Sequence, residues 1–371
     1  MKPTIVIAGG GTGGHVFPGL AVASAMTTLA DVEVVFVGSP RGLEKELVPA
    51  RGHRLELLDV QPIKGGGPMR AMRGALVAAR ATWRARRLVK ELAPAAVLSV
   101  GGYAAGPMAL ASALGGAPLA ILEPNGVLGL ANRLLAPIAK RAYVAWPGVL
   151  DSKIVRPLGV PLRDGFEASP YRAGSSARVL VMGGSQGARA INDAMPEALA
   201  TVAKRVPMLE VVHQSGRGQE GDLRTKYEAR GVRADVRAFL DDVPGELARA
   251  DLLVARSGAG TVAEIAAVGR AAIFIPFPFA ADDHQRSNAE SLSKNGAAVC
   301  ILQDDATPAR LADEIGGLLT DGPRREAMAD AARAMGRPRA AWDVAGDLLH
   351  LARIPLRISR TQTNGSAVEV S

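Results

Sequence analysis

The chain places a glycine-rich turn directly after an apolar run in each of its halves. GGGTGGHVFPG at 9–19 follows the run at 5–8, and GGSQGA at 183–188 follows the run at 179–182. An apolar run that ends in clustered glycines predicts a buried strand, a tight turn and a helix. The turn lets backbone N–H groups approach an anion, and the helix N-terminus adds partial positive charge. Two such units predict two similar domains that face one cleft.

The length of 371 residues also favours two domains, because single hydrophobic cores rarely grow beyond ~250 residues. Apolar runs alternate with helical stretches, which predicts the α/β class with doubly wound sheets. Residues 157–161 contain prolines and a glycine and resemble a linker. We therefore expect a first domain at 1–161, a second at 162–337, a closing helix at 338–352 and a disordered polar tail at 357–371.

The same patterns predict the individual elements. Strands are expected at 4–8, 32–37, 54–59, 95–100, 118–122 and 141–145, and then at 178–182, 208–213, 234–238, 251–255, 271–275 and 298–301. The expected helices before the closing one are 18–30, 42–50, 68–92, 107–114, 128–139, 187–205, 219–229, 242–249, 260–268, 284–295, 307–320 and 323–336. Residues 92–122 carry no charge and are long enough to cross a bilayer. Their glycines and prolines instead indicate buried strands around a helix.

Composition narrows the class of partner. The net charge of +8 suggests an anionic partner, which could be nucleic acid, a membrane or a phosphorylated substrate. Aromatic residues make up only 4% of the chain and no known nucleic-acid module is present, so we expect no nucleic-acid partner. The single cysteine, Cys300, excludes an internal disulfide and a cysteine-based zinc site. The N-terminus lacks the pattern of a signal peptide, which favours the cytoplasm.

The first glycine turn also fits a dinucleotide-binding pattern, through Gly9, Gly11 and Gly14. That pattern expects an acidic residue at the end of the next strand, where it would bind a ribose. The strand instead ends at Gly38, and Arg41 follows, which argues against NAD but would suit NADP. An NADP-dependent oxidoreductase, or another nucleotide-binding α/β protein, therefore remains the alternative.

A third glycine loop, SGAGTVAEIAAVG at 257–269, places Glu264 one turn inside a helix. Its carboxylate could accept both hydroxyls of a ribose while the loop N–H groups bind a diphosphate. In isolation, Glu264 would be explained by the helix dipole alone. Downstream, Asp283, His284, Gln285 and Asn288 form a polar turn that would suit a sugar, although Asp282 or Asp283 could simply cap a helix.

These segments resemble the MurG family of bacterial glycosyltransferases. The resemblance rests on GGGTGGHVFPGLAVA (9–23), VGGYAAGP (100–107), GGSQGARAIN (183–192), HQSG (213–216) and RSGAGTVAEIAAVGRAAIFIPFPFAADDHQ (256–285). It implies a GT-B fold, in which two Rossmann-like domains face a cleft and the last helix crosses back to the first domain. It also implies inverting transfer of N-acetylglucosamine from UDP-N-acetylglucosamine to the 4-hydroxyl of undecaprenyl-pyrophosphoryl-N-acetylmuramyl-pentapeptide, the step from lipid I to lipid II in peptidoglycan synthesis.

The resemblance further implies roles for individual residues. The donor would contact Thr12, Gly13, Gly14, Asn125, Arg163, Ser185, Gln186, Leu240, Ala259, Gly260, Thr261, Val262, Ala263, Glu264, His284 and Gln285. The acceptor would contact Gly101, Gly102 and Tyr103. Two segments depart from the family pattern, because Leu122 and Pro124 replace polar partners in HEQN, and Val160 and Leu162 alter GNPVR.

The implied reaction needs a general base and a way to stabilise charge on the departing UDP. His15 is the first candidate for the base and Glu123 the second, because each would lie in the cleft. Glycine-loop amides and helix N-termini would stabilise the β-phosphate. The chain contains no D-x-D triplet, so we expect neither a metal ion nor another cofactor.

Residues 60–90 contain basic residues but no acidic ones. Apolar side chains recur there at helical spacing, which predicts a basic amphipathic helix suited to an anionic membrane surface. The candidate contacts are Leu76, Arg80, Trp83, Arg84 and Arg87. A core-packed helix with a solvated basic face is the alternative. With a polyprenyl acceptor, the membrane interpretation predicts a peripheral protein at the cytoplasmic face of the cell membrane.

Overall fold

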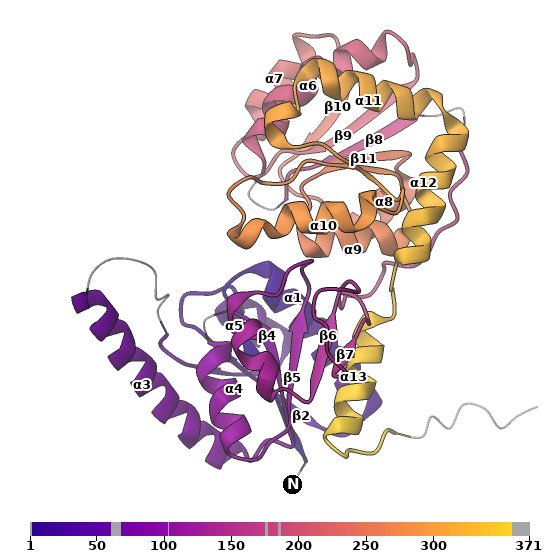
Figure 1. Cartoon of the computed structure of the whole chain (residues 1–371). Coiled ribbons are helices and arrows are strands. Elements are labelled where there is room, and N and C mark those ends of the chain that lie inside the picture. The colour runs from indigo at the N-terminus through magenta and orange to yellow at the C-terminus, as the bar shows by residue number, and fades with distance from the viewer. Residues whose placement is uncertain (1, 61–67, 103, 175–176, 185–186, 358–371) are drawn as a thin grey trace, which may run out of the picture.

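A computed structural model describes residues 2–60, 68–102, 104–174, 177–184 and 187–357, with the backbone alone at 68–79. Each half of the chain forms a parallel sheet covered by helices on both faces (Figure 1). This arrangement confirms the predicted α/β class. It also explains why the central strands are almost continuously apolar and buried, since helices cover both faces of the sheet there, whereas the outer strands at 54–57 and 234–237 are more polar and more exposed.

The N-terminal sheet has the order β3-β2-β1-β4-β5-β6-β7. Its strands are β1 (Thr4–Gly9), β2 (Glu33–Gly38), β3 (Arg54–Leu57), β4 (Ala96–Gly101), β5 (Leu119–Glu123), β6 (Arg141–Val144) and β7 (Val155–Arg156). Strand β7 was not predicted, because it lies at the start of the proline-rich segment read as a linker. Its pairing with β6 is short and lies at the sheet edge, where the proline that follows it is tolerated.

The C-terminal sheet has the order β10-β9-β8-β11-β12-β13. Its strands are β8 (Ala177–Met182), β9 (Leu209–Gln214), β10 (Ala234–Arg237), β11 (Leu252–Ala255), β12 (Ala272–Phe274) and β13 (Val299–Cys300). In both sheets the chain reverses its direction of winding beside the first strand. The crevice at the carboxyl ends of these strands is where open α/β sheets bind ligands.

Thirteen α-helices are described. They are α1 (Gly13–Leu29), α2 (Glu44–Leu47), α3 (Pro68–Leu92), α4 (Ala105–Leu114), α5 (Leu130–Leu135), α6 (Arg189–Ala203), α7 (Glu220–Glu228), α8 (Val243–Arg249), α9 (Ala259–Val268), α10 (His284–Ser293), α11 (Pro308–Thr320), α12 (Gly322–Met335) and α13 (Ala340–Leu351). None of the helices in the described ranges is both long and apolar enough to cross a membrane.

Prolines explain the main differences from the predicted helices. The first helix was expected to begin at Pro18 but begins at Gly13, so that Pro18 lies inside it. The helices expected at 42–50 and 128–139 are each split into a short α-helix and a 3₁₀ turn, η1 (Pro49–Arg51) and η2 (Ala136–Ile138). A proline at the start of each turn interrupts the helical hydrogen bonds.

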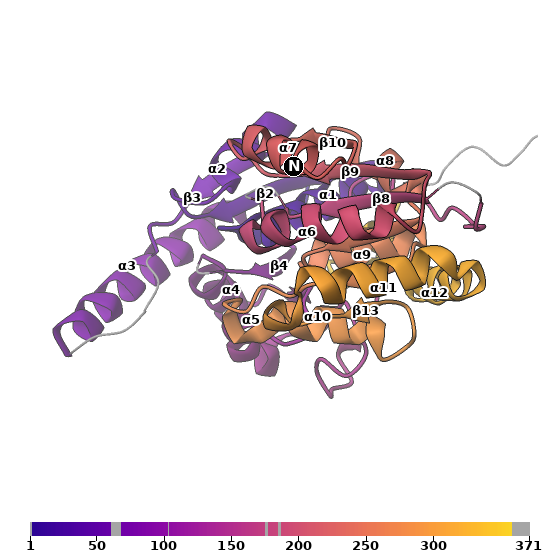
Figure 2. The same ribbon diagram turned by 90° about the horizontal axis from the view of Figure 1, so that it is seen from above.

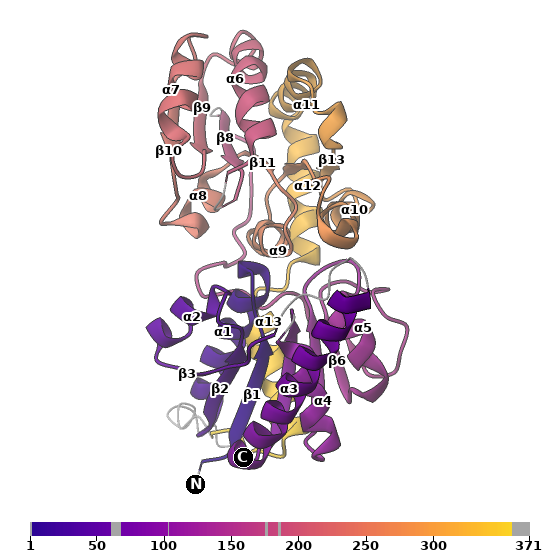
Figure 3. The same ribbon diagram turned by 90° about the vertical axis from the view of Figure 1, so that its left-hand side faces the viewer.

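The last helix, α13, packs against α1 of the N-terminal sheet (Figure 1 and Figure 3). Val344 and Leu348 are buried in the same hydrophobic cluster as Val22, and fully burying such a side chain is worth roughly 1.5–3 kcal/mol. Asp347 accepts hydrogen bonds from the Tyr143 hydroxyl (2.8 Å) and from Arg141 Nε (3.0 Å). The helix expected at 338–352 therefore joins the end of the chain to its first half.

Arg357, the first residue of the expected disordered tail, is ordered. The backbone N–H of Arg357 donates to the carbonyl of Leu29 at 2.7 Å, which fixes this residue at the end of α1. Residues 358–371, the rest of the expected tail, lie outside the described residues.

Candidate functional site

Two glycine turns of the N-terminal sheet interlock. The Gly10 N–H donates to the Gly101 carbonyl at 3.3 Å. At Gly102, where φ is 83°, an added Cβ would lie only 2.4 Å from the Gly10 oxygen. Only glycine fits such a close approach with positive φ. The turn at 9–14 was predicted to lie between donor and acceptor, and the turn at Gly101 and Gly102 was predicted to contact the acceptor. These two turns therefore form one surface.

Glu44, which the sequence patterns did not single out, fills the space beneath this surface. Its side chain is almost completely buried and accepts hydrogen bonds from the backbone N–H groups of Gly11 (2.8 Å) and Ser39 (2.7 Å). Gly10 and Gly42 leave room for the carboxylate, because a Cβ at either position would lie within 2.6 Å of it. The sequence does show an acidic residue soon after the second strand. The dinucleotide-binding pattern, however, expects that residue at the end of the strand itself.

His15 lies in the first turn of α1 and faces the turn at Gly101 and Gly102. A Cβ on Gly101 would lie 3.1 Å from His15 Nε2, and Thr12 Oγ1 lies 3.4 Å from His15 Nδ1. Burial lowers the pKa of His15, although the charge of Glu123 and a hydrogen bond with the Gly10 backbone oppose the shift. The imidazole is therefore mainly neutral near pH 7, which is the form that can accept a proton.

Glu123, the second candidate for the base, is buried at the end of β5 and is fully hydrogen-bonded. Its Oε1 accepts from Asn125 Nδ2 (3.0 Å), while its Oε2 accepts from the Gly129 N–H (2.8 Å) and Asn132 Nδ2 (3.1 Å). These bonds fix the loop between β5 and α5. A carboxylate that already accepts this many bonds is better placed to hold Asn125 than to remove a proton.

Helix α9 lies along the side of the C-terminal half that faces the N-terminal half (Figure 3). Gly258 is its N-cap residue, no side chain caps the helix, and its first turn contains no acidic residue. Such an end can bind an anion through its N–H groups and its dipole. Arg163 Nη1 lies 3.9 Å from Glu264 Oε1. Burial raises the pKa of Glu264 to about 7, and the Arg163 charge limits this rise.

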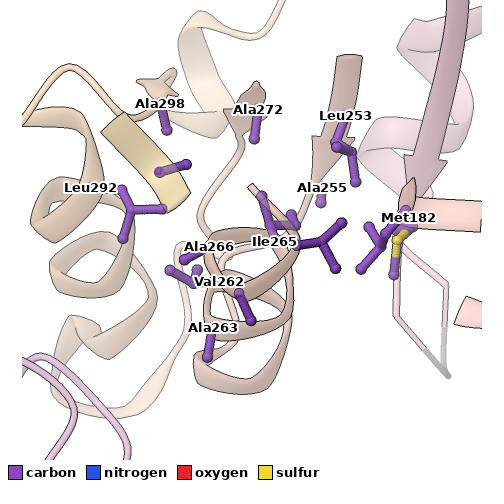
Figure 4. Close-up of a cluster of buried hydrophobic side chains, with 14 of the residues drawn as sticks. Met182, Leu253, Ala255, Val262, Ala263, Ile265, Ala266, Ala272, Leu292 and Ala298 are labelled. Atoms are coloured by element: carbon purple, nitrogen blue, oxygen red, sulfur yellow. The ribbon is translucent and has the colours of Figure 1, made fainter. Parts of the chain in front are cut away.

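Four residues predicted to contact the donor are buried, namely Leu240, Ala259, Val262 and Ala263. Val262 and Ala263 belong to the hydrophobic cluster beneath α9 (Figure 4), and Leu240 belongs to the same cluster. These residues can offer a ligand only their backbone groups. The more accessible residues of the α9 loop are Gly260, Thr261 and Glu264, while Ala259 is buried.

The polar turn before α10 has an unusual backbone. Asp282 and Asp283 both have positive φ, 52° and 50°, which is strained for residues other than glycine. Asp283 is the N-cap residue of α10, but its side chain caps nothing, so the simple capping interpretation is wrong. His284 Nδ1 lies 2.7 Å from the Ala281 carbonyl, and Gln285 Oε1 accepts from the Phe277 N–H at 3.0 Å.

The HQSG segment lies beneath the second glycine turn. His213 is buried, with Nδ1 2.8 Å from the Tyr227 hydroxyl and Nε2 3.1 Å from Asn192 Oδ1. Burial lowers the pKa of His213 to about 3, so the ring is neutral. Asn192 Nδ2 donates to the Ser215 carbonyl, against which Gly187 packs closely. This buried network supports the turn from below.

The structure thus brings two groups of predicted residues to the facing ends of the two sheets. Thr12, Gly13, Gly14, His15, Gly101, Gly102, Glu123 and Asn125 come from the N-terminal half, and Arg163, Glu264, His284 and Gln285 lie opposite. His284 is close enough to influence the pKa of His15. The predicted residues Tyr103, Ser185 and Gln186 lie outside the described residues.

Two other features lie away from this arrangement. A groove of about 780 Å³ between α7 and strands β9 and β10 contains none of the predicted residues. Across the described ranges, no three His, Cys, Asp or Glu side chains come together in a way that could hold a metal ion.

Family models match both halves of the chain. The glycosyltransferase family 28 N-terminal domain matches residues 5–144, and the family 28 C-terminal domain matches residues 178–344. The chain belongs to glycosyltransferase family 28. As a family 28 protein it is an enzyme that transfers a sugar, and its two parallel-sheet domains have the GT-B fold.

Curated relatives indicate which members of family 28 the chain resembles. A protein of Sorangium cellulosum named UDP-N-acetylglucosamine–N-acetylmuramyl-(pentapeptide) pyrophosphoryl-undecaprenol N-acetylglucosamine transferase is 52% identical over 361 residues, 95% of this chain and 89% of that protein. A protein of the same name from Anaeromyxobacter sp. is 41% identical, over 94% of this chain and 93% of that protein.

Solved structures agree with this placement. The crystal structure of Acinetobacter baumannii MurG has a TM-score of 0.81 at 31% identity, covering 94% of this chain and all of that one. The glycosyltransferase CalG4, at 18% identity and a TM-score of 0.64, shares the fold. The family 28 chain described here is therefore a member of the MurG family.

Proposed function

We propose that this enzyme transfers N-acetylglucosamine from UDP-N-acetylglucosamine to the muramyl 4-hydroxyl of a polyprenyl-pyrophosphoryl muramyl-pentapeptide, converting lipid I to lipid II. The observation that carries the proposal is the uncapped N-terminus of α9 with Glu264 beside it, facing a neutral His15 on the other sheet. The names of the relatives at 52% and 41% identity supply the chemical identity of donor and acceptor.

The proposed chemistry divides the work between the two halves. In the C-terminal half, the α9 N–H groups bind the UDP diphosphate and stabilise the charge that develops as UDP leaves. Glu264 accepts the ribose hydroxyls, and Arg163 keeps its carboxylate near the nucleotide. In the N-terminal half, His15 removes the proton of the acceptor hydroxyl as this oxygen attacks the anomeric carbon. Attack from the face opposite UDP inverts that carbon.

The NADP alternative is not favoured. A dinucleotide would need the N–H groups of the first glycine turn and the space at the end of β2 for its phosphates. Those N–H groups, of Gly11 and Ser39, already donate to the buried Glu44. A carboxylate in that position would also repel the 2′-phosphate that distinguishes NADP.

Calorimetric titration with UDP-N-acetylglucosamine, UDP and NADPH distinguishes the proposed sugar transferase from an NADP-dependent enzyme. The two uridine ligands should bind and NADPH should not. A transfer assay with a short-chain lipid I analogue then tests the reaction, and its rate should persist in EDTA because no step uses a metal. Binding of NADPH without binding of UDP would exclude the proposal, and loss of rate in EDTA that magnesium restores would exclude the metal-free donor site.

We also propose that α3 carries the enzyme to the cytoplasmic face of the cell membrane as a peripheral protein. The helix projects from the N-terminal half (Figure 2). Its buried face holds Ala81, Ala85 and Leu88, so Trp83 remains 60% exposed, with the Arg87 guanidinium 3.9 Å from the ring centre. Arg80 and Arg84 are exposed as well, whereas the Leu76 side chain lies outside the described residues.

Neighbouring helices add apolar surface to α3, which supports membrane contact over a merely solvated basic face. Helix α4 packs on α3 and exposes Leu114, and α5 packs on α4 and exposes Leu130 and Leu134. Apolar side chains beside a row of arginines suit the boundary between lipid headgroups and acyl chains.

The membrane proposal is tested by changing Arg80, Arg84 and Arg87 together to glutamate. Each basic residue near an anionic surface contributes about 1 kcal/mol, so the variant should no longer sediment with anionic vesicles at low salt. UDP affinity and activity on a water-soluble acceptor should be unchanged. Undiminished sedimentation of the folded variant would exclude α3 as the membrane contact.

A further inference from the structure

The two halves of the molecule are joined by the buried side chain of Asn288, near the start of α10. Asn288 Oδ1 accepts the Gly126 N–H at 2.7 Å, and its Nδ2 donates to Asn125 Oδ1 at 3.3 Å. The same Nδ2 donates to the Ser257 carbonyl at 3.1 Å. We call these four residues the Asn288 bridge. Two of them belong to the loop after β5, and Ser257 immediately precedes the N-cap residue of α9.

The bridge can form in only one orientation of its amide groups. The Gly126 N–H can only donate, so Asn288 must turn its oxygen toward Gly126 and its NH₂ group toward Asn125. Asn125 must then present its oxygen to Asn288 and its NH₂ group to the Glu123 carboxylate, as observed. Asn125 has a second Nδ2–H beyond the one that Glu123 accepts, and its side chain is partly exposed.

Further hydrogen bonds connect the bridge to β4, the strand that leads into the turn at Gly101 and Gly102. Asn132 Nδ2 donates to Glu123 Oε2 at 3.1 Å, and the Ser99 hydroxyl donates to Asn132 Oδ1 at 3.0 Å. Ser99 lies on β4, two residues before Gly101, which faces His15. A continuous series of buried or part-buried hydrogen bonds therefore runs from the surface near His15 to the loop that starts α9.

The same contact is closely packed and leaves no room for a side chain at position 126. A Cβ on Gly126 would lie 2.4 Å from the Ser287 hydroxyl oxygen. The Ser257 hydroxyl also donates to the Gln285 carbonyl at 2.7 Å, which ties the α9 loop to α10. By contrast, the Arg133–Asp282 ion pair that also joins the two halves is exposed and spans 3.9 Å. An exposed pair of this kind contributes little, so the buried bridge is the main polar connection at this contact.

We propose that Asn288 is a positioning residue for glycosyl transfer. It sets the distance between the α9 loop and the His15 surface, and it orients Asn125 so that the free Nδ2–H of that residue is offered to the transferred sugar. The inference rests on the proposed function, and it gives Asn288 a different role from the direct sugar contact that the sequence suggested.

The test replaces the Asn288 amide by a near-isosteric group that cannot donate. In Asn288→Asp, the carboxylate can still accept from Gly126 but would face two oxygens, those of Asn125 and Ser257. We expect kcat to fall tenfold to hundredfold, the cost of losing one or two buried hydrogen bonds, with UDP affinity within about twofold of wild type. The matched control is Asn295→Asp, because Asn295 is exposed beyond the end of α10 and bonds only locally, to Ser291.

A double-mutant cycle separates positioning from general destabilisation. If Asn288 acts through Asn125, the variant with Asn125→Ala and Asn288→Asp should be about as slow as Asn125→Ala alone. Multiplicative losses in the double variant would overturn the role of Asn288 in orienting Asn125, and a kcat for Asn288→Asp equal to that of the Asn295→Asp control would overturn the whole proposal. If the aspartate variant does not fold, Asn288→Ala with Asn295→Ala repeats the comparison without burying a charge.

Small-angle X-ray scattering of the UDP-bound enzyme tests the bridge without any assay of activity. The radius of gyration should increase in Asn288→Asp and stay at the wild-type value in Asn295→Asp. An unchanged radius in Asn288→Asp would overturn the role in setting the distance between the halves. Failure of the wild type to transfer the sugar would instead refute the proposed function. The scattering result would still test whether the Asn288 bridge sets the distance between the halves.

Discussion

The first glycine turn and the α9 loop have similar sequences but different environments. Both follow a buried strand and lead into a helix without a side-chain cap. In the first turn, the Gly10 and Gly11 N–H groups already donate to Gly101 and to the buried Glu44. At the α9 loop, no side chain caps the helix and its first turn contains no acidic residue, while Glu264 lies one turn inside the helix beside Arg163.

This difference shows that a glycine turn after a strand predicts a local backbone shape and does not by itself predict a bound anion. Groups within the protein accept the Gly10 and Gly11 N–H groups of the first turn, and we propose that this turn holds His15 against Gly101. We propose that the α9 loop instead keeps its helix end for a ligand. The two similar motifs thus divide the proposed reaction into proton removal on one side and charge stabilisation on the other.

Removing the imidazole should have the largest effect. His15→Ala should lower kcat by roughly 10²–10⁴, the usual contribution of a general base, and should leave UDP affinity unchanged because the donor loop is on the other sheet. In the wild type, the acidic limb of kcat should fall at a pKa below 6.5, since burial lowers the pKa of His15 and only its neutral form accepts a proton. Steady-state kinetics across pH provide the check, and a near-normal kcat would remove His15 from the role.

A change in the α9 loop should mainly affect UDP affinity, in contrast to a change at His15. Glu264→Ala should weaken UDP binding by about tenfold to hundredfold, because losing hydrogen bonds to a charged group costs roughly 1.5–3 kcal/mol. Isothermal calorimetry measures this directly. An unchanged affinity in a folded variant would mean that Glu264 is only a helix residue favoured by the dipole.

The sequence was sufficient for the parts of the site that are continuous along the chain. Apolar runs and glycine turns predicted both sheets and the position of His15 and Glu264. The position of the Glu44 carboxylate inside the first turn could not be predicted. Glu44 is separated from Gly11 along the chain, and its role becomes clear only from the packing of its carboxylate against glycines.

The role of Asn288 was unpredictable for a related reason. As a residue in a polar turn, it looked like one more contact to a sugar. Its bonds to Gly126 and Asn125 depend on how the two halves face each other, which no pattern within the C-terminal half contains. The capping interpretation of Asp283 failed because the backbone there has positive φ, and a cap residue normally has extended geometry.

A change at Glu44 should affect stability more than donor binding. Glu44→Gln replaces one acceptor oxygen with an NH₂ group facing a backbone N–H, so a buried donor is left unpaired at a cost of about 1–3 kcal/mol. Denaturant unfolding should show this loss, while UDP affinity should stay within twofold of wild type. A large loss of UDP affinity would contradict the division between the two turns.

The smallest effect concerns the pH dependence of donor binding. The ribose hydroxyls donate to the ionised Glu264 carboxylate, so ligand binding favours the charged form and should release a proton near neutral pH. Burial raises the pKa of this group to about 7 in the free enzyme, and affinity should be complete above that value and lost as the pH falls through it. With a pKa near 7, the ionised fraction at pH 6 is about a tenth of that at pH 8, so affinity for UDP-N-acetylglucosamine should fall about tenfold, or ~1.4 kcal/mol. The control is Glu264→Gln, which should make the affinity independent of pH, because the diphosphate of this ligand does not itself titrate in that range.

A pH dependence that persists in Glu264→Gln would place the titrating group elsewhere. A flat wild-type profile would mean that Glu264 does not contact the ribose as a carboxylate.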